Sequence, residues 1–596
     1  MSLLAYGPKD VFRRSARRLP FPRRLGSPCA PRRRGLCGPV LSAGAPDTSK
    51  KPILITTPIF YVNGEPHIGH LYSVLLADAL ARWHRVLGHP TKMVTGTDEH
   101  GIKVQQAAEA QGRDPMAFCD KMTTYFVDLW KRANIQVDEY VRTTEPRHVG
   151  AVTEMWKRLT ENGQLYKGTF EGWYSVSDES FLTDTQVADE LSPSGTPTGK
   201  KISLESGNSA IWVAEENYKF RLSNYQNRLI DWIQKQCPIY PMSKSEQILS
   251  ELQREKFGDL SVSRLSRKVK WGIPVPGDSE HVIYVWIDAL TSYLTACGFP
   301  HSSEPSPSFW PADYHILGKD ILKFHAIYWP ALLLATSQQL PRRLIVHAHW
   351  TKNKKKIAKS TGNVVDPNEI ISRHGVNEVR FFLLRQGGIS DDGDYNDDDL
   401  NNLVSATLVD SLGNLITRCI SSSLNPSCQW PTLDHNNLTD HELGLVRELN
   451  QLVSEVDSLY KTCEFGLAIH SLFVFLAKIN GHFTRSEPWN LVKQPSSCSD
   501  TSQRLNSILY ISLESVRIVS LLLQPVIPGK TDEFLEYLGI PADHRNPVQW
   551  RFGYNYRSHS SKPSIPKHPF VMFDHRQKKK VKFELKQRRK VEAASP

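Results

Sequence analysis

The sequence predicts an α/β protein whose doubly wound parallel sheet is split by an insertion and followed by an all-α helical bundle. Short apolar, β-branched runs alternate with helical stretches from residue 53 onward. A Gly/Ser/Pro-rich stretch with short aromatic strands interrupts this alternation over residues 168–240. Beyond residue 400 the strand signals stop and helical periodicity takes over.

The first strand–helix units lie at residues 53–112. Residues 53–57 (ILITT) are typical of a buried parallel strand. A turn at 63–64 leads to a helix predicted over 71–87, with Gly88 placed as its C-terminal cap. Residues 93–95 predict a second strand, which is followed by a polar turn and a helix ending at Gly112. Such sheets bind ligands at the carboxyl ends of their strands, where these polar turns lie.

The strand pattern resumes after the insertion, and the helical pattern replaces it later. Residues 282–286 and 344–346 predict strands, and residues 445–460 and 467–483 predict helices. We expect an α/β domain over 50–400, in which 168–240 form the insertion and 350–400 a loop region. A helical domain over 401–550 and a basic tail over 551–596 complete the expected organisation.

The net charge of +11 is concentrated in two tails. Residues 1–49 carry +8 and the last 21 residues +7, which leaves −4 on the 526 residues between them. The first tail is Arg-rich, nearly free of acids and lacks a long apolar stretch, so it predicts a mitochondrial transit peptide over 1–49. A retained basic arm that binds RNA is the alternative. The run at 578–590 either contacts RNA phosphates or is a solvated tail.

Cysteine usage and hydropathy argue against three other classes of protein. The nine cysteines are scattered, with no C-x-x-C pair, so a thiolate zinc site and a disulfide framework are not expected. There is no uncharged apolar run of about 18 residues, so no membrane span is expected.

Two motifs carry the chemistry. The first is residues 67–70 (HIGH), which follow a strand and a turn and open a helix, so that His67 and His70 share one helical face. A helix N-terminus suits a triphosphate, and Gly69 leaves room for a flat base. The second is residues 356–360 (KIAKS), whose lysines can neutralise charge as pyrophosphate departs. In isolation this second motif also fits a solvated basic turn.

The two motifs, in this order across a split α/β domain, resemble the class I aminoacyl-tRNA synthetases, whose signatures are HIGH and KMSKS. This implies a Rossmann-type catalytic domain. The first signature is intact, whereas Ile357 and Ala358 replace Met and Ser of the second. Met to Ile nearly conserves volume and apolarity, so loop packing should survive.

Further segments resemble the methionyl-tRNA synthetase family of the mitochondrial type. They are residues 58–64 (PIFYVNG), 96–101 (GTDEHG), 259–264 (DLSVSR), 271–276 (WGIPVP), 284–290 (YVWIDAL) and 318–325 (GKDILKFH). The resemblance covers about residues 52–528. It implies ATP-dependent ligation of L-methionine to tRNA(Met) through a methionyl-adenylate, in the mitochondrial matrix.

The resemblance implies a methionine site and an ATP site. Asp98 would hold the methionine ammonium group, and the side chain would be enclosed by Ile59, Tyr61, Trp286, Ala289, Tyr293, Ile321, Phe324 and His325. A polarisable thioether suits aromatic walls. ATP would contact His67, Gly69, His70, Asp320 and Lys359, with Mg²⁺ bound to the ATP. The catalytic residues would be His67, His70, Lys356 and Lys359.

The helical region resembles the family's anticodon-binding bundle. Asn414 and Arg418 are spaced i and i+4, and Trp489 supplies an aromatic ring. Hydrogen-bonding groups beside a stacking ring suit unpaired bases. Without the family resemblance, core packing of Trp489 is an equal interpretation.

The remaining expectations concern zinc, rival functions and oligomeric state. Ser175 stands where some relatives have Cys, and no clustered cysteines accompany it, so the zinc-free form of the insertion is expected. The insertion is too short for the editing domain of the leucine, isoleucine and valine enzymes, and the cysteine enzyme's zinc thiolates are missing. A non-catalytic tRNA-binding relative is the alternative from another class. We expect a monomer.

Overall fold

The computed structural model describes residues 47, 49–175, 180–182, 184–192, 195–204, 207–254, 256–300, 309–357, 363–426, 429–433, 438–493, 499–547 and 550–553. The predicted transit peptide lies outside these residues except at 47 and 49, and so does the basic tail beyond 553.

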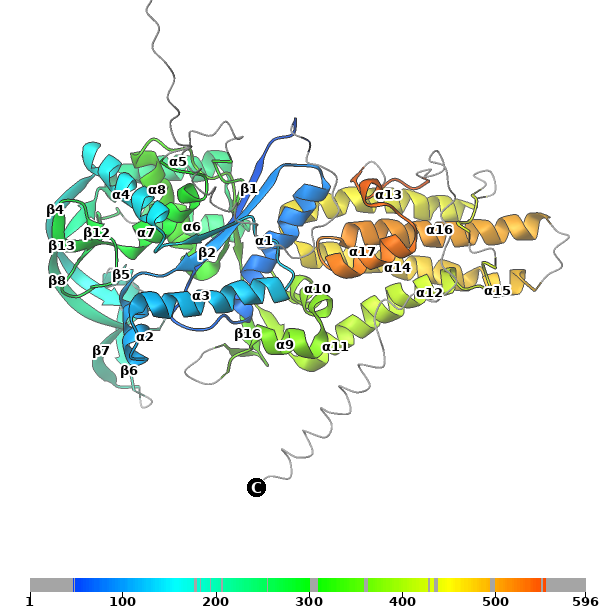
Figure 1. Ribbon diagram of the computed structural model, residues 1–596, viewed down its shortest axis with the longest axis horizontal. Helices are drawn as coiled ribbons and strands as arrows, with labels where there is room; N and C mark the ends of the chain where they lie inside the picture. The colour runs from blue at the N-terminus through cyan, green and yellow to red at the C-terminus, as the bar shows by residue number, and fades with distance from the viewer. Residues whose placement is uncertain are drawn as a thin grey trace, which may run out of the picture. The chain divides into compact units, whose positions relative to one another are not determined.

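A six-stranded parallel sheet forms the centre of the α/β region, in the order β3-β2-β1-β14-β15-β9. The strands are β1 (Ile53–Tyr61), β2 (Thr91–Asp98), β3 (Glu139–Arg142), β9 (Ile239–Tyr240), β14 (Tyr314–Gly318) and β15 (Leu344–His347). The chain builds outward from β1 in one direction through β2 and β3 and in the other through β14 and β15. Strands β1 and β2 are labelled in Figure 1. The fold class predicted from the sequence is confirmed.

Helices cover both faces of this sheet. One hydrophobic core contains α1 (Ile68–Val86), α3 (Pro115–Arg132) and α10 (Val376–Gln386). A second core contains α4 (Pro146–Glu161), α7 (Val285–Thr295) and α8 (Trp329–Ala335). Side chains of β14 alternate between the two cores: Ile316 belongs to the first and Leu317 to the second. This alternation is what a strand buried on both faces requires.

The carboxyl ends of β1 and β2 are fixed by close backbone packing. Their register pairs Ile59 with Gly96 and Tyr61 with Asp98, after an irregularity between Thr56 and Ile59. A Cβ on Gly96 would lie 2.0 Å from the Val141 carbonyl oxygen of β3 and 2.9 Å from Cγ2 of Ile59. Only glycine allows β1, β2 and β3 to approach this closely.

The insertion is an antiparallel sheet in the order β5-β4-β8-β7-β6, with β10 paired to β8. Its strands are β4 (Leu165–Ser175), β5 (Ser180–Leu182), β6 (Val187–Leu191), β7 (Pro197–Ser203), β8 (Ser209–Phe220) and β10 (Leu260–Ser261). Helices α5 (Gln226–Gln236) and α6 (Met242–Arg254) flank β9, the strand through which the chain rejoins the parallel sheet.

Two three-stranded sheets and two short helices complete the α/β region. The first sheet comprises β11 (Ser263–Leu265), β12 (Pro274–Val275) and β13 (Asp278–Ile283), and the second β16 (Trp350–Lys352), β17 (Lys355–Lys356) and β18 (Gly393–Tyr395). The helices are α2 (Ile102–Ala110) and α9 (Pro367–His374).

The predicted strand over 282–286 is wrong in its second half. Strand β13 ends at Ile283 and pairs antiparallel with β11 and β12, not with the parallel sheet. Helix α7 begins at Val285, so Trp286 is helical. A short apolar run does not distinguish a strand from a buried helix start, and this run contains both.

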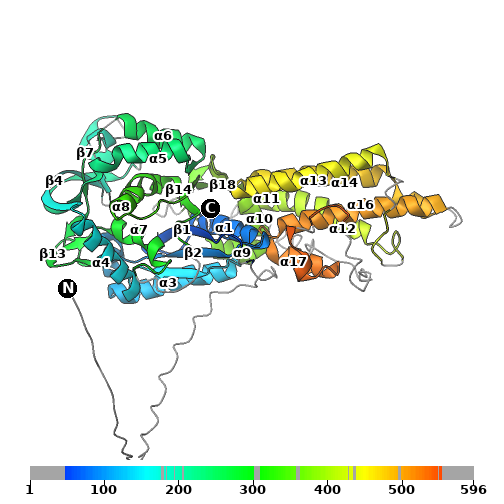
Figure 2. The same cartoon turned by 90° about the horizontal axis from the view of Figure 1, so that it is seen from above.

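The remaining described residues are mainly helical. A continuous helical stretch runs through α11 (Asp397–Val404), a π-helical segment (Ser405–Gly413) and α12 (Asn414–Cys419). It is followed by α13 (Asp440–Lys461), α14 (Phe465–Arg485), α15 (Pro488–Leu491), α16 (Ser499–Leu523) and α17 (Pro528–Tyr537). Helices α13 and α14 lie side by side (Figure 2). They contain the helices predicted from periodicity over 445–460 and 467–483, so that prediction is confirmed.

Helix α16 is the apolar centre of this bundle. Among the described residues it alone is long and apolar enough to cross a membrane, with a mean hydropathy of 1.4 over 18 residues. However, 89% of this stretch is buried inside the protein. It also contains the fully buried ion pair Glu514–Arg517, with an N–O distance of 2.6 Å. These features are typical of the core helix of a bundle.

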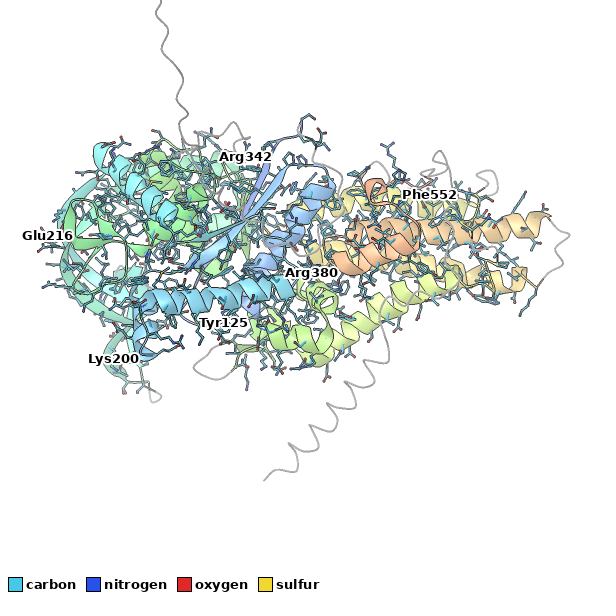
Figure 3. All side chains as sticks on the ribbon, in the orientation of Figure 1. Tyr125, Lys200, Glu216, Arg342, Arg380 and Phe552 are labelled. Atoms are coloured by element: carbon cyan, nitrogen blue, oxygen red, sulfur yellow. The ribbon has the colours of Figure 1, made fainter. Side chains whose placement is uncertain are left out.

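The α/β and helical regions share one hydrophobic core. The Trp83 indole of α1 stacks on Trp550 at a centroid distance of 4.8 Å and donates to Asp457 of α13 at 3.0 Å. Arg380 of α10 lies at the same junction (Figure 3) and is buried. Its five N–H donors reach the Asp78 carboxylate at 2.7 Å and four backbone carbonyls at 2.9–3.2 Å, those of Ala133, Asn134, Pro525 and Val526.

We predict that Arg380→Ala destabilises the protein by about 3–5 kcal/mol, because it leaves buried carbonyls without donors and removes one partner of a buried carboxylate. The measurement is the free energy of unfolding in urea. Lys157→Ala, which removes the exposed Lys157–Glu161 pair, is the control and should change stability by less than about 1 kcal/mol. Equal effects of the two substitutions would contradict the prediction.

Candidate active site

The two histidines of the first motif form a stacked pair at the N-terminus of α1. Their ring centroids are 3.8 Å apart. Nδ1 of His67 accepts a hydrogen bond from the Gly69 N–H at 3.1 Å, and Nδ1 of His70 accepts one from the His67 N–H at 3.2 Å. Since both Nδ1 atoms accept, the neutral rings carry their protons on Nε2. The site therefore has two imidazole N–H donors beside a helix N-terminus, a suitable arrangement for phosphate oxygens.

Gly69 has a different local role from the one the sequence suggested. A Cβ at this position would lie 3.0 Å from Cε1 of the His67 ring and 3.1 Å from its Nδ1. A side chain there would displace the imidazole that caps α1. The glycine thus preserves the histidine pair, whatever room it also leaves for a base.

The second motif begins on β17 and is joined to α1 by the segment that follows it. The Ile68 N–H donates to the Val365 carbonyl at 3.3 Å, and Lys352 Nζ donates to the Val364 carbonyl at 3.0 Å. Lys356 is exposed, and Ile357 is partly buried against the hydrophobic core, in line with the expected packing of the apolar substitution. Lys359, predicted to bind ATP, lies outside the described residues, as does the rest of the loop at 358–362.

The residues predicted to bind methionine come from β1, β2, α7 and the two short helical turns after β14, around the carboxyl ends of the central strands. Ile59 and Tyr61 lie on β1, and Asp98 ends β2 with only 5% of its surface exposed. The Tyr61 hydroxyl donates to the His100 carbonyl at 3.0 Å, which joins the ends of these strands.

The other predicted pocket residues lie on α7 and on the helical turns after β14. Trp286 of α7 stacks on Phe324 with centroids 3.5 Å apart and planes 12° apart. On the same helix, Tyr293 lies 2.7 Å from His325 through its hydroxyl and Nε2. Ala289, one turn after Trp286, is buried, and Ile321 is partly buried.

His325 is held as one neutral tautomer. Its Nδ1 lies 2.9 Å from the Ile321 carbonyl, an acceptor, so this nitrogen donates. Burial lowers the pKa of His325 to about 4. The neutral ring therefore accepts from the Tyr293 hydroxyl through Nε2, which orients both side chains without a charge in an otherwise apolar wall.

Sequence reasoning missed His315 of β14. Its Nδ1 lies 2.5 Å from the Thr56 hydroxyl, and its ring centroid is 4.4 Å from that of Tyr293. Burial lowers its pKa well below the usual range, so it is neutral. Its position inside an apolar strand was the signal available in the sequence.

Asp320, predicted near the ribose, follows β14 directly. Its carboxylate lies 3.2 Å from Nε2 of His349, and 66% of its side-chain surface is exposed. A Cβ on Gly318 would lie 2.6 Å from Oδ1 of Asp320. The glycine thus allows the carboxylate to fold back over the strand end.

The predicted anticodon residues lie on the helical region. The Arg418 guanidinium is 5.0 Å from the Phe483 ring centroid and hydrogen-bonds to Asn480. Its Nε donates to the Asn414 carbonyl at 3.4 Å, so the two residues share a helical face as their spacing predicted. Trp489 is 39% exposed. This exposure does not fit the core interpretation and leaves part of the indole available for stacking.

The insertion was expected to lack zinc. Ser175 is buried at the end of β4. Across the part of the chain that the structure describes, there is no group of three or more His, Cys, Asp or Glu side chains placed to hold a metal ion. Residues 176–179 lie outside that part, so the zinc-free form stays a prediction.

Known proteins resemble this chain over most of its length. The family described as tRNA synthetases class I (M) matches residues 53–420. A probable mitochondrial methionine–tRNA ligase of Dictyostelium discoideum is 46% identical over 532 residues, covering 88% of this chain and 92% of the relative. The mitochondrial methionine–tRNA ligase of Homo sapiens is 42% identical over 523 residues, covering 85% and 87%.

A solved structure has the same fold. Mycobacterium tuberculosis methionyl-tRNA synthetase in complex with methionyl-adenylate matches with a TM-score of 0.81 and 34% identity, covering 88% of this chain and all of that chain. The family match, the curated relatives and this structure all point to one family. The chain belongs to the class I tRNA synthetases and, among them, to the family of mitochondrial methionine–tRNA ligases.

Proposed function

We propose that this protein uses ATP to join L-methionine to tRNA(Met) through a methionyl-adenylate. The observation that carries the proposal is the placement of the stacked His67–His70 pair and the Trp286–Phe324 aromatic wall around the carboxyl ends of one parallel sheet. Ligands of such sheets bind at this edge. The Mycobacterium tuberculosis relative binds methionyl-adenylate, which contains both halves of the proposed site's ligand.

The methionine side chain is proposed to lie between α7 and the turns after β14. Asp98 accepts from the ammonium group in a charge-assisted contact. The thioether packs on aromatic and apolar walls from Ile59, Tyr61, Trp286, Ala289, Tyr293, Ile321, Phe324 and His325. A neutral His325 suits this role, because it costs free energy to bury a charged imidazolium beside an uncharged thioether.

ATP is proposed to bind along the N-terminus of α1, beside His67, Gly69 and His70, with Asp320 near the ribose. The methionine carboxylate attacks the α-phosphate and pyrophosphate leaves. Lys356 and Lys359 stabilise the leaving charge, and His67 and His70 donate to phosphate oxygens. The terminal hydroxyl of tRNA(Met) then displaces AMP. Catalysis rests on positioning and electrostatics, without a covalent nucleophile from the protein.

Mg²⁺ is proposed to enter with ATP. This cation commonly binds through substrate phosphates and water with one or two protein carboxylates. Its contribution would be to offset phosphate charge. Binding through substrate phosphates needs no cluster of protein ligands. Among the described residues there is no group of three or more His, Cys, Asp or Glu side chains placed to hold a metal ion.

The helical region over 401–550 is proposed to bind the anticodon through Asn414, Arg418 and Trp489. The catalytic domain would occupy 50–400, and residues 1–49 would act as a transit peptide that directs the enzyme to the mitochondrial matrix. The mitochondrial names of the curated relatives support the compartment. Sedimentation analysis would test the proposed monomer.

We predict that the full chain catalyses ATP–pyrophosphate exchange with methionine and not with leucine, isoleucine or cysteine. The aromatic walls favour a polarisable thioether over an aliphatic side chain, and exchange reports the adenylation step alone. The measurement is label transfer from pyrophosphate into ATP for each amino acid. A folded protein that binds tRNA but gives no exchange with any of them would support the non-catalytic alternative.

We predict that His70→Ala lowers the rate of methionine-dependent exchange about 100- to 1,000-fold, because it removes a preorganised donor to phosphate. His89→Ala, just beyond the other end of α1, should change the rate less than about threefold. Thermal melts of both variants separate a folding defect from loss of catalysis. A His70→Ala enzyme that remains folded and keeps the full rate would exclude the proposed role.

We predict that Trp489→Ala weakens aminoacylation of tRNA(Met) at least about tenfold, since a lost base-stacking contact costs about 1–3 kcal/mol. Pyrophosphate exchange should be unchanged, because it needs no tRNA. Trp212→Ala is the control, since Trp212 is 54% exposed on the insertion sheet. Equal losses in exchange and aminoacylation would reject the anticodon assignment.

A further inference from the structure

A buried carboxylate on α7 is held by two histidines from separate elements. Oδ2 of Asp288 lies 2.7 Å from Nδ1 of His100, and Oδ1 lies 2.7 Å from Nε2 of His148. Burial alone would raise the pKa of this carboxyl, but the two histidines lower it to about 2. Asp288 is thus an acceptor only, and each histidine donates to it through the nitrogen named.

His148 attaches α4 to two positions that lie about two turns apart on α7. Besides its contact with Asp288, its Nδ1 lies 2.8 Å from the hydroxyl of Thr295, seven residues farther along α7. His148 is fully buried. One imidazole therefore fixes both the distance between these helices and the rotation of α7 about its axis.

His100 attaches α7 to the carboxyl end of β2. It lies two residues after Asp98, and its carbonyl accepts from the Tyr61 hydroxyl at 3.0 Å. Its ring centroid lies 5.6 Å from that of Trp271, whose indole N–H donates to the Glu99 carbonyl at 2.6 Å. The turn that contains the proposed ammonium-binding carboxylate is therefore joined to α7 through Asp288.

The opposite face of α7 lines the proposed methionine pocket. At 3.6 residues per turn, Trp286, Ala289 and Tyr293 form one stripe, and Asp288 and Thr295 lie roughly half a turn away around the axis. The histidine contacts thus hold the back of the helix, while its front forms the aromatic wall with Phe324 and His325.

We infer that Asp288 is a positioning residue that sets the distance between the two sides of the methionine pocket, acting through His100 and His148 without touching the substrate. One side is the Asp98 carboxylate at the end of β2, and the other is the stripe of α7. A methionine held by its ammonium group at one side and its thioether at the other depends on this spacing. The inference rests on the proposed function, because it uses the proposed methionine site.

A purely structural role makes a different prediction. If Asp288 only stabilised the fold, its replacement would lower the stability of the protein and leave the kinetic constants of the remaining folded enzyme unchanged. If the replacement perturbed the whole domain, it would change the KM values for methionine and for ATP equally. The ATP side of the site rests on α1. Among the described residues, the Asp288 carboxylate bonds to His100 and His148 and not to α1.

The test is steady-state pyrophosphate exchange by full-length Asp288→Asn at varied methionine and varied ATP. The asparagine keeps the size but cannot accept from both histidines. We expect the KM for methionine to rise about tenfold, while the KM for ATP changes less than about twofold. Equal increases in both KM values, or no increase in the KM for methionine, would overturn the inference.

Two pairs of variants, one pair at His100 and one at His148, keep the test decisive if Asp288→Asn folds poorly. His100→Asn places an amide N–H where Nδ1 donates, and His148→Gln places one where Nε2 donates, whereas the alanine variants remove the donors. We expect His100→Ala and His148→Ala to raise the KM for methionine, and the amide variants to restore much of the wild-type value. Alanine and amide variants with the same KM for methionine would contradict a role that acts through these donors.

Glu442→Gln is the matched control. Glu442 is also a buried carboxylate, lying 3.3 Å from His482 and 2.9 Å from Arg504 in the helical region. This substitution should lower the melting temperature without changing the KM for methionine. Wild-type exchange with methionine is measured first, so its absence would refute the proposed function independently of any result with Asp288.

Discussion

The guanidinium of Arg380 is the point at which the separate parts of this protein are joined. It has five N–H donors and uses them on acceptors from α1, from the end of α3 and from the turn after α16. Burial lowers the pKa of Arg380 to about 10, against the opposing effect of Asp78. It is still a cation at neutral pH, and each backbone carbonyl that it satisfies is one that the packed junction could not expose to water.

The same contact determines how the active site is supported. Asp78, which receives one of the five donors, lies two turns along α1 from the histidine pair. Helix α1 therefore has its N-terminus at the proposed ATP site and its middle anchored to the helical region. A rigid helix of this kind passes on any displacement at the junction to the histidines, so the precision of the site depends on interactions far from it.

Much of this architecture could be predicted from the sequence because it follows from local patterns. The β-branched run at 53–57 and the periodic helix after it are seen as β1 and α1. The histidines at 67 and 70 stack because His67 is the extended N-cap of α1 and exchanges capping hydrogen bonds with the first turn, which contains His70. The strand predicted over 282–286 is wrong after Ile283, because apolarity alone does not fix the dihedral angles and Val285 begins a helix. The π-helical turn at 324–328, which contains Phe324 and His325, has no signature in the periodicity.

The candidate site was predictable where a family motif or a helical spacing marked it, and not where it depends on tertiary contacts. Trp286 and Phe324 are 38 positions apart, yet their rings stack at 3.5 Å. Their pairing became an expectation only through the family resemblance. Asp288, His100 and His148 come from three elements, and each residue taken alone looks like ordinary core polarity. Only the fold brings the three together, which is why sequence reasoning passed over them.

Helix α16 has a consequence for the chain before it is folded. Its segment Asp500–Leu523 of 24 residues is long and apolar enough to cross a lipid bilayer when the rest of the bundle does not cover it. A charged side chain near the middle of such a segment raises the cost of entering lipid by about 3 kcal/mol. Glu514 and Arg517 occupy this position, and in the folded bundle they neutralise each other. The ion pair at the centre of the bundle therefore also makes this segment a poor membrane span while the chain is unfolded.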